Sequence, residues 1–309
     1  MNILFVWEGA DTTLWEKILR ETLGEVEFRA YPETGTLAEI DYVLAWMPPV
    51  GFLKTLPDLK AIISIGAGVS HILRDPQLPD GVPIVRLIDE VSVRDMSHHA
   101  LHWVLHFHRN YDCYARRQTA RQWLRQPVIV PGQRRVGILG VGAIGGSIAR
   151  FLADHDFEVT GWSRSEKTIP GVHTVSGDDG FSEILSSTEI LINMLPATEA
   201  TRNILDISAF AQMPKGGFLI NMGRGETVVD QDLIAALDSG QLDGAALDVF
   251  REEPLPPDNP LWTHPKVFVT PHAAGATNQM SAPRQIASDI LKIEAGIELK
   301  HVTDISKGY

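Results

Sequence analysis

Short apolar runs alternate with amphipathic stretches along the whole chain. In the first third, the runs predict strands, and Thr13–Thr22 has the apolar spacing of an amphipathic helix. The predicted strands are Asn2–Trp7, Val26–Arg29, Tyr42–Trp46, Ala61–Ile65 and Pro83–Leu87. Strands that alternate with helices indicate a parallel sheet covered on both faces.

A polar stretch from Ser92 to Arg125 has no glycine or proline and predicts one long helix that continues into an arm. A second alternating series follows, with helices at Ile144–Ala153 and Asp230–Leu237 and a last helix at Ala282–Leu299. Its predicted strands are Arg135–Leu139, Glu158–Trp162, Ile190–Met194, Phe218–Asn221, Gly244–Val249 and Val267–Thr270. The pattern therefore predicts two α/β units joined by long helices.

Composition narrows the class of protein. The chain has 309 residues, of which 44% are hydrophobic and 21% charged, and this excludes a disordered chain. The length fits about two domains. The formal charge of 27 − 39 = −12 argues against nucleic acid or an anionic membrane as the main partner, although a local pocket can still bind a small anion.

The single cysteine, Cys113, excludes an internal disulfide and fits a reducing compartment. The longest apolar stretch, Tyr42 to Leu53, is too short to span a bilayer and contains Pro48-Pro49. The N-terminus has neither a basic region nor a small-residue cleavage site. We expect a cytoplasmic enzyme or binding protein.

A glycine-rich segment, Gly140-Val141-Gly142-Ala143-Ile144-Gly145, follows a predicted strand and opens a predicted helix. Gly140 would make a tight turn, Gly142 would let the backbone approach a pyrophosphate, and Gly145 would let helix and strand pack closely. The helix dipole and N–H groups would hold the phosphates. An ordinary glycine turn is the alternative, but the flanking strand and helix favour dinucleotide binding.

The next predicted strand leads into Ser163-Arg164-Ser165. An NAD site carries an acidic residue near this point, which accepts hydrogen bonds from the ribose 2′-hydroxyl. Here the hydroxyl of Ser163 and the guanidinium of Arg164 suit a 2′-phosphate. A solvated loop is the alternative, and the acidic Glu166 lies close by in the sequence. We expect NADP, with NADPH preferred over NADH.

Arg224, Glu253 and His272 each follow a different predicted strand of the second series. Open α/β sheets bind ligands beyond the carboxyl ends of their strands, so the three side chains could converge. A 2-keto acid needs a cation for its carboxylate, a proton donor for its carbonyl oxygen and a hydride source. Arg224, His272 and a nicotinamide fit these needs, and a carboxylate beside the imidazole would orient it and favour its charged form. Taken singly, each residue could instead be an ordinary surface or loop side chain.

Several motifs in order resemble the D-isomer-specific 2-hydroxyacid dehydrogenases over nearly the whole chain. They are Gly140–Gly145, Leu195-Pro196, Asn221–Gly225, Asp248–Pro256 and Pro271–Gly275. Further details are similar to the bacterial glyoxylate/hydroxypyruvate reductase A branch: Trp46-Met47-Pro48-Pro49, Gly66-Ala67-Gly68-Val69, Trp162-Ser163-Arg164, Glu253-Pro254-Leu255-Pro256-Pro257 and the terminal Gly308-Tyr309.

The resemblance implies His272 as the acid/base, Glu253 as its carboxylate partner and Arg224 as the substrate anchor. The implied substrate contacts are Trp46, the backbone around Ala67 and Gly68, Arg224 and His272. The cofactor contacts are then Gly140, Gly142, Ala143, Ile144, Gly145, Ser163, Arg164, Leu195, Pro196, Asp248, His272 and Ala274, with Asp248 facing the nicotinamide carboxamide. No metal is implied.

Two segments depart from the family pattern. Ser70 stands where many members carry Asp or Asn, and Ser97-His98-His99 replaces a commoner small-Glu-Tyr run. His98, His102 and His106 recur at the i, i+4 spacing of metal ligands, but no cysteine or carboxylate joins them on that face.

The segment from Asn110 to Arg134 combines aromatic residues with arginines, a composition found at nucleic-acid sites and at protein interfaces. Its residues are Tyr111, Tyr114, Trp123, Arg116, Arg117, Arg121, Arg125 and Arg134, with Arg109 just before it. The resemblance implies that this arm mediates dimerisation, so we expect a homodimer.

The sequence thus predicts an α/β fold of two doubly wound parallel-sheet domains, Rossmann- or flavodoxin-like, with a cleft between them. The substrate domain would be 1–98 plus 285–309, and the NAD(P) domain 99–284. The expected function is NADPH-dependent reduction of glyoxylate, hydroxypyruvate or similar small 2-keto acids. Two alternatives stay open: a dehydrogenase for a bulkier 2-keto acid, and a dinucleotide-sensing corepressor of the same fold.

Overall fold

The computed structural model describes residues 1–305 and divides into two compact units. Unit 1 comprises Met1–Ser92 and the chain from Thr277 onward, and unit 2 comprises Val93–Ala276. The chain passes between the units at 92/93 and 276/277, a few residues before the expected borders at 98/99 and 284/285. The pair Gly308-Tyr309 lies outside the described residues. The α/β fold with two parallel sheets is confirmed.

Unit 1 contains a parallel five-stranded sheet in the order β2-β1-β3-β4-β5 within the described residues. This is the strand order of flavodoxin-like folds, in which the switch point lies between β1 and β3. The strands are β1 (Asn2–Val6), β2 (Glu27–Ala30), β3 (Tyr42–Ala45), β4 (Ala61–Ser64) and β5 (Ile84–Val85). The helices are α1 (Thr13–Leu23), α2 (Ser70–Leu73), α9 (Ser281–Glu294) and the short 3₁₀ turns η1 (Leu37–Glu39) and η2 (Leu53–Thr55).

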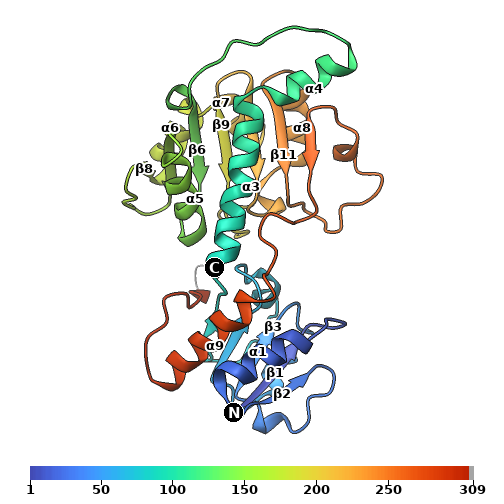
Figure 1. The fold of residues 1–309 in the computed structure, drawn as a ribbon, viewed down its shortest axis with the longest axis vertical. Coiled ribbons are helices and arrows are strands. Elements are labelled where there is room, and N and C mark those ends of the chain that lie inside the picture. Colours follow the sequence, from blue (N-terminus) through green and yellow to red (C-terminus); the bar gives the residue numbers. More distant parts are fainter. Residues whose placement is uncertain (306–309) are drawn as a thin grey trace. The chain divides into compact units, whose positions relative to one another are not determined.

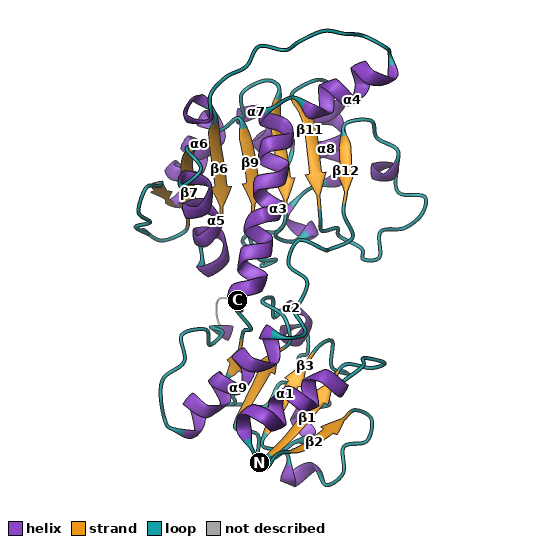
Figure 2. Ribbon diagram, in the orientation of Figure 1, coloured by secondary structure: helices purple, strands orange, loops and turns teal. Residues whose placement is uncertain are grey.

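Helices α1 and α9, from the two ends of the chain, cover one face of this sheet (Figure 2). Trp15 and Leu19 of α1 and Ile286 and Ile290 of α9 are buried in the same core as β1 and β3. The other face is covered by shorter segments, including η2 and α2. Because β1, β3 and β4 are apolar on both faces, they form the centre of the unit.

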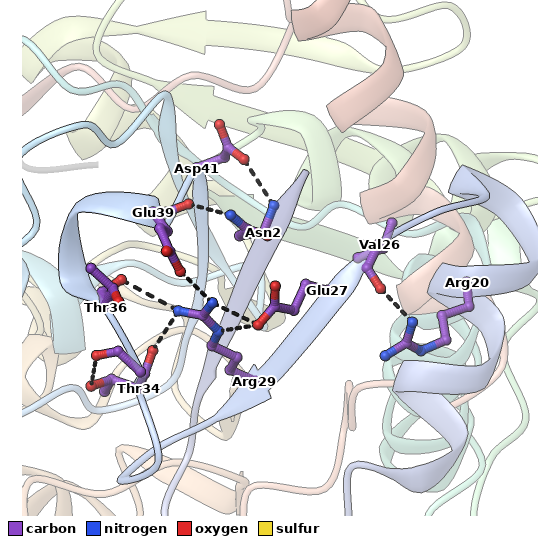
Figure 3. A network of polar contacts seen from close by, with 10 residues as sticks. Asn2, Arg20, Val26, Glu27, Arg29, Thr34, Thr36, Glu39 and Asp41 are labelled. Atoms are coloured by element: carbon purple, nitrogen blue, oxygen red, sulfur yellow. Dashed lines mark hydrogen bonds and ion pairs between the residues drawn. The ribbon is translucent and has the colours of Figure 1, made fainter.

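Arg29 of β2 organises the loop that follows its strand. Its guanidinium donates to the carbonyls of Thr34 and Thr36, at 3.0 and 3.3 Å, and pairs with Glu39 at 2.6 Å (Figure 3). Asn2 of β1 bonds to Asp41 and to the Glu39 carbonyl in the same network. These contacts fasten the connection between β2 and β3 at the sheet edge.

Unit 2 contains a parallel seven-stranded sheet in the order β12-β11-β10-β9-β6-β7-β8 within the described residues. The order reverses between β6 and β9, which is the switch point where Rossmann sheets bind dinucleotides. The strands are β6 (Arg135–Leu139), β7 (Glu158–Ser163), β8 (His173–Ser176), β9 (Ile190–Asn193), β10 (Gly217–Asn221), β11 (Leu242–Leu247) and β12 (Val267–Val269).

Helices cover both faces of this second sheet (Figure 1). Residues of α3 and α5 form one core, and residues of α6, α7 and α8 form the other. The helices are α3 (Glu90–His108), α4 (Tyr111–Thr119), α5 (Ala143–Ala153), α6 (Gly177–Ser187), α7 (Ile207–Gln212), α8 (Asp230–Asp238) and the 3₁₀ turns η3 (Pro131–Gln133), η4 (Gly225–Thr227) and η5 (Pro260–Trp262).

Two helix predictions were wrong in extent. The single helix expected from Ser92 to Arg125 is divided into α3 and α4, because Asn110 adopts a left-handed conformation with φ 57°. The last helix ends at Glu294 instead of Leu299, and Gly296, with φ 67°, follows its end. The edge strand β8 was not predicted, since its residues show no apolar run.

No helix within residues 1–305 combines the length and the apolar character needed to cross a membrane.

Candidate active site

The glycine loop lies at the switch point of unit 2, between β6 and α5. Gly140 has φ 93°, and a Cβ on Gly145 would lie 2.1 Å from the Gly140 carbonyl oxygen, so a side chain there is excluded. A Cβ on Gly142 would meet nothing within 4 Å, so the backbone is open on that side. The start of α5 at Ala143 and Ile144 therefore has room for a pyrophosphate beside its N–H groups.

The end of β7 lies directly beside this loop. The Trp162 carbonyl accepts hydrogen bonds from the N–H groups of Gly140 and Val141, at 2.9 and 3.2 Å. Ser163 and the exposed Arg164 follow at once, and the Ser163 hydroxyl donates to the Ser165 carbonyl at 2.7 Å. Both candidate 2′-phosphate ligands thus lie next to the glycine loop, at the end of β7, the strand adjacent to β6.

Leu195-Pro196 follows β9 on the other side of the loop. Leu195 is buried and adjoins both Gly140 and Gly223. Its N–H donates to the Asn193 side chain at 3.2 Å, and Asn193 in turn donates to Asn221 and Thr227 at 2.9 and 2.7 Å. This buried polar network joins the ends of β9 and β10.

The same network holds the backbone of Arg224. The Arg224 carbonyl accepts from Thr227 at 2.6 Å and from Asn221 at 3.3 Å. Gly225 is needed because a Cβ there would lie 1.9 Å from the Phe250 carbonyl carbon. The loop that carries Arg224 therefore packs against the start of the loop that carries Glu253.

The Arg224 guanidinium is half-buried and donates to the Gly223 carbonyl at 2.7 Å. Burial lowers the pKa of Arg224, and the negative charges of Glu226 and Glu253 oppose that shift. An arginine stays protonated under these conditions, so the guanidinium supplies a fixed positive charge.

Glu253 and His272 face each other across two loops. His272 Nδ1 lies 2.7 Å from Glu253 Oε2, and the other carboxylate oxygen accepts from the Phe250 N–H at 2.9 Å. Burial alone would raise the pKa of Glu253, but the hydrogen bonds from His272 and Phe250 and the charges of His272 and Arg224 together lower it. The carboxylate is thereby kept ionised beside the imidazole.

Asp248 shapes the loop that carries His272. Its buried carboxylate accepts from the Thr270 hydroxyl at 2.6 Å and from the N–H groups of Ala273 and Ala274 at 2.8 and 3.0 Å. The Asp248 carbonyl accepts from the His272 N–H at 2.8 Å. These bonds hold His272 in a left-handed backbone conformation, with φ 51°, that is uncommon for a residue with a side chain.

The remaining predicted residues belong to unit 1. The half-buried ring of Trp46 follows β3 and packs against His71 and Trp7, with ring centroids 4.4 and 6.0 Å away. Ala67 and Gly68 follow the neighbouring strand β4. Trp7, Trp46 and the Ala67–Gly68 loop thus lie at the carboxyl ends of β1, β3 and β4, around the switch point of this sheet.

No group of three or more metal-ligating side chains is arranged to hold an ion among the residues that the structure describes. His102 and His106 are ring neighbours on α3, and His106 also packs against Phe268. Burial lowers the pKa of His106, which favours the neutral ring.

The structure brings Arg224, Glu253, Asp248 and His272 together and sets the glycine loop beside Ser163, Arg164 and Leu195. Sequence reasoning missed the supporting residues Asn193 and Thr227. A polar residue that ends an otherwise buried strand was the available signal for Asn193, as it was for Asn221.

These features define an oxidoreductase that binds a nicotinamide dinucleotide. Residues 101–274 match the family described as D-isomer specific 2-hydroxyacid dehydrogenase, NAD binding domain.

Solved structures extend the match to the whole chain. A D-isomer specific 2-hydroxyacid dehydrogenase from Xanthobacter autotrophicus Py2, in complex with NADPH and MES, is 35% identical with a TM-score of 0.95, over 100% of this chain and 99% of that one. An NADPH-dependent glyoxylate/hydroxypyruvate reductase from Sinorhizobium meliloti is 34% identical with a TM-score of 0.91, over 100% of both chains. A probable 2-hydroxyacid dehydrogenase from Rhizobium etli CFN 42, with NADP bound, is 32% identical with a TM-score of 0.91, over 100% and 99%. The chain belongs to the D-isomer specific 2-hydroxyacid dehydrogenase family.

Proposed function

We propose that this protein reduces small 2-keto acids with NADPH, converting glyoxylate to glycolate and hydroxypyruvate to D-glycerate. The observation that carries the proposal is the 2.7 Å contact between His272 and Glu253, beside the charge of Arg224. The similarity to the Sinorhizobium meliloti reductase supports these substrates.

His272 is the proposed proton donor. Its Nδ1 faces Glu253, so Nε2 is the nitrogen left to protonate the carbonyl oxygen of the substrate. The Glu253 carboxylate stabilises the imidazolium before transfer and fixes the orientation of the ring. When bound, the nicotinamide supplies the hydride to the keto carbon, and the imidazolium proton goes to the new hydroxyl.

The residues proposed to contact the 2-keto acid are Trp46, Ala67 and Gly68 of unit 1 and Arg224 and His272 of unit 2. The planar guanidinium of Arg224 can grip a carboxylate through two parallel bonds and polarise the keto oxygen. The bulky Trp46 ring packs closely on Gly66, where a Cβ would lie 2.9 Å from the ring. Glyoxylate and hydroxypyruvate are small, so they are compatible with a substrate site that contains this ring.

NADPH is the proposed cofactor. The open side of Gly142 and the first turn of α5 fit the pyrophosphate, and Ser163 and Arg164 fit the 2′-phosphate. Gly140, Ala143, Ile144, Gly145, Leu195 and Pro196 complete the dinucleotide contacts, with Asp248, His272 and Ala274 at the nicotinamide end. NADPH or NADP in the related structures from Xanthobacter autotrophicus and Rhizobium etli supports this choice.

A substrate panel followed at the NADPH absorbance band tests the proposal. Glyoxylate and hydroxypyruvate should give the highest kcat/KM, and a bulky aryl 2-keto acid such as phenylpyruvate a much lower one. A higher value for phenylpyruvate would reassign the enzyme to bulkier substrates. Tight NADPH binding without oxidation of NADPH by any 2-keto acid would favour a dinucleotide sensor instead.

We also propose a cytoplasmic homodimer. In the arm after α4, Trp123 is 95% exposed, and Val128 and Val130 are exposed as well, so a second copy of the chain would bury them. Light scattering should report a dimer for the wild type and a monomer for Trp123→Arg. A monomeric wild type would contradict this part of the proposal.

A further inference from the structure

The loop after β4 contains three consecutive peptide groups whose carbonyls are all hydrogen-bonded. They join Gly66 to Ala67, Ala67 to Gly68 and Gly68 to Val69. Each carbonyl accepts a hydrogen bond from within unit 1. The donors are the Leu87 N–H at 3.4 Å for Gly66, Arg86 Nε at 2.8 Å for Ala67 and the Ser64 hydroxyl at 3.0 Å for Gly68.

The N–H groups of the same three peptides behave differently. Those of Ala67, Gly68 and Val69 donate to no acceptor among residues 1–305. Consecutive backbone N–H groups that have no acceptor within these described residues are suited to bind an anion. Because each carbonyl is already bonded, its peptide is polarised, and the N–H at the other end becomes a stronger donor.

Two side chains account for most of this arrangement. Ser64 is fully buried at the end of β4, and its hydroxyl donates to the Gly68 carbonyl while accepting from the Gly66 N–H at 3.3 Å. Arg86 is half-buried and carries a full positive charge on the carbonyl side of the loop.

Arg86 is itself held by the C-terminal part of unit 1. Its N–H donates to the His301 carbonyl at 2.9 Å, and the Thr303 N–H donates to the Ile84 carbonyl at 2.8 Å, so residues 301–303 pair antiparallel with β5. These backbone hydrogen bonds hold the main chain of Arg86 in place, and with it the start of the side chain that carries the guanidinium.

We propose that Arg86 and Ser64 are positioning residues for the carboxylate of the 2-keto acid. They turn the carbonyls of the loop away from the anion and direct the N–H groups of Ala67, Gly68 and Val69 toward it, and Arg86 adds a positive charge behind the loop. This inference rests on the proposed function, because it takes the carboxylate of that substrate as the anion.

The test separates binding from turnover. Arg86→Gln should raise KM for glyoxylate about tenfold, as expected for loss of a hydrogen bond from a charged group, and leave kcat within about twofold. Arg86→Lys should restore part of the loss, because it returns the charge without the guanidinium geometry. Ser64→Ala should raise KM by a smaller factor. NADPH affinity should not change in any of the three.

Arg74→Gln is the matched control, because Arg74 is an exposed arginine of the same unit. Its KM should equal that of the wild type.

If Arg86→Gln fails to fold, Arg86→Lys and Ser64→Ala carry the test. Unchanged KM in both folded variants would overturn the inference.

Oxalate binding distinguishes this failure from failure of the proposed function. Calorimetry of the NADPH complex with oxalate, a non-reducible dicarboxylate, should show about tenfold weaker binding in Arg86→Gln. A wild type that binds oxalate but reduces neither glyoxylate nor hydroxypyruvate would reject the proposed function alone. A wild type that reduces both, with equal oxalate affinity in Arg86→Gln, would reject the positioning role alone.

Discussion

Each unit has a glycine-containing turn after a buried central strand, and the two turns create N–H donors in different ways. In unit 2 the turn after β6 leads into the eleven-residue helix α5, and its shape depends on contacts that exclude a Cβ, as at Gly145. In unit 1 the turn after β4 leads into the four-residue α2, and Ser64 and Arg86 hold its carbonyls. Adding a Cβ at Gly145 should therefore disrupt the turn of unit 2, whereas removing the side chain of Ser64 or Arg86 should disrupt the turn of unit 1.

The proposed proton donor and the unit 1 loop should also differ in which kinetic constant they control. Unit 2 carries the proposed proton donor His272, the proposed substrate anchor Arg224 and the proposed cofactor residues, whereas the unit 1 loop offers only donors for an anion. Changes at His272 or in the glycine loop should act on kcat or on NADPH affinity, and changes in the unit 1 loop on KM for the keto acid.

The largest expected effect belongs to His272→Asn. Loss of the proton donor should lower kcat about 10²–10⁴-fold and leave NADPH affinity nearly unchanged. Stopped-flow turnover and a fluorescence titration with NADPH measure the two quantities. His173→Asn is the control, because the exposed His173 also pairs with a glutamate, Glu183, at 3.3 Å. Activity of His272→Asn near that of the wild type would remove this histidine from the mechanism.

Alanine at two glycines of the unit 2 turn should separate its packing from its ligand contact. Gly145→Ala should destabilise the fold by about 1–3 kcal/mol because its Cβ overlaps the Gly140 carbonyl. Gly142→Ala should leave the melting temperature unchanged, since its Cβ meets nothing, yet weaken NADPH binding by filling the space for the pyrophosphate. Thermal melts and NADPH titrations check both. Normal NADPH affinity in Gly142→Ala would place the dinucleotide elsewhere.

The cofactor preference should be at least about tenfold in kcat/KM for NADPH over NADH. The double change Ser163→Asp with Arg164→Ala should reverse it, because a carboxylate repels the 2′-phosphate and accepts bonds from a free 2′-hydroxyl. Steady-state rates with both cofactors are compared at matched ionic strength. Arg150→Ala, which removes an arginine paired with Asp154 on α5, should keep the wild-type preference. Equal use of the two cofactors by the wild type would reject this assignment.

The smallest effect should be a pH dependence of stability at Glu253. Its pKa lies below the ordinary value of 4.5, so the ionised form stabilises the folded state above that pH, and this stability is lost as pH falls through the lowered value. Glu253→Gln should therefore melt below the wild type at neutral pH, and the difference should shrink under acid conditions. Glu252→Gln, an exposed neighbour, should show no such melting difference, and a constant melting difference between Glu253→Gln and the wild type at all pH values would contradict the pairing.

The sequence predicted elements whose signal is local. Buried strands such as β3 and β9 were found because their residues are continuously apolar, and Arg224, Glu253 and His272 were found because polar residues follow such strands. The break at Asn110 was missed because a single left-handed residue leaves no periodic signal. Arg86 and Ser64 were missed because their importance depends on the loop carbonyls that they contact, and Arg86 lies 19 residues from Ala67.

The division of the chain between the units bears on its synthesis at the ribosome. Unit 2 is continuous, whereas the sheet of unit 1 needs Ile286 and Ile290 of α9 to cover the face that holds Trp15. The first segment to be translated is thus the last to complete its core, and unit 2 can fold while unit 1 still exposes apolar surface to chaperones. A released chain truncated after Ala276 should accordingly resist protease in unit 2 and be cleaved in unit 1, and equal resistance would show that α9 is dispensable for that core.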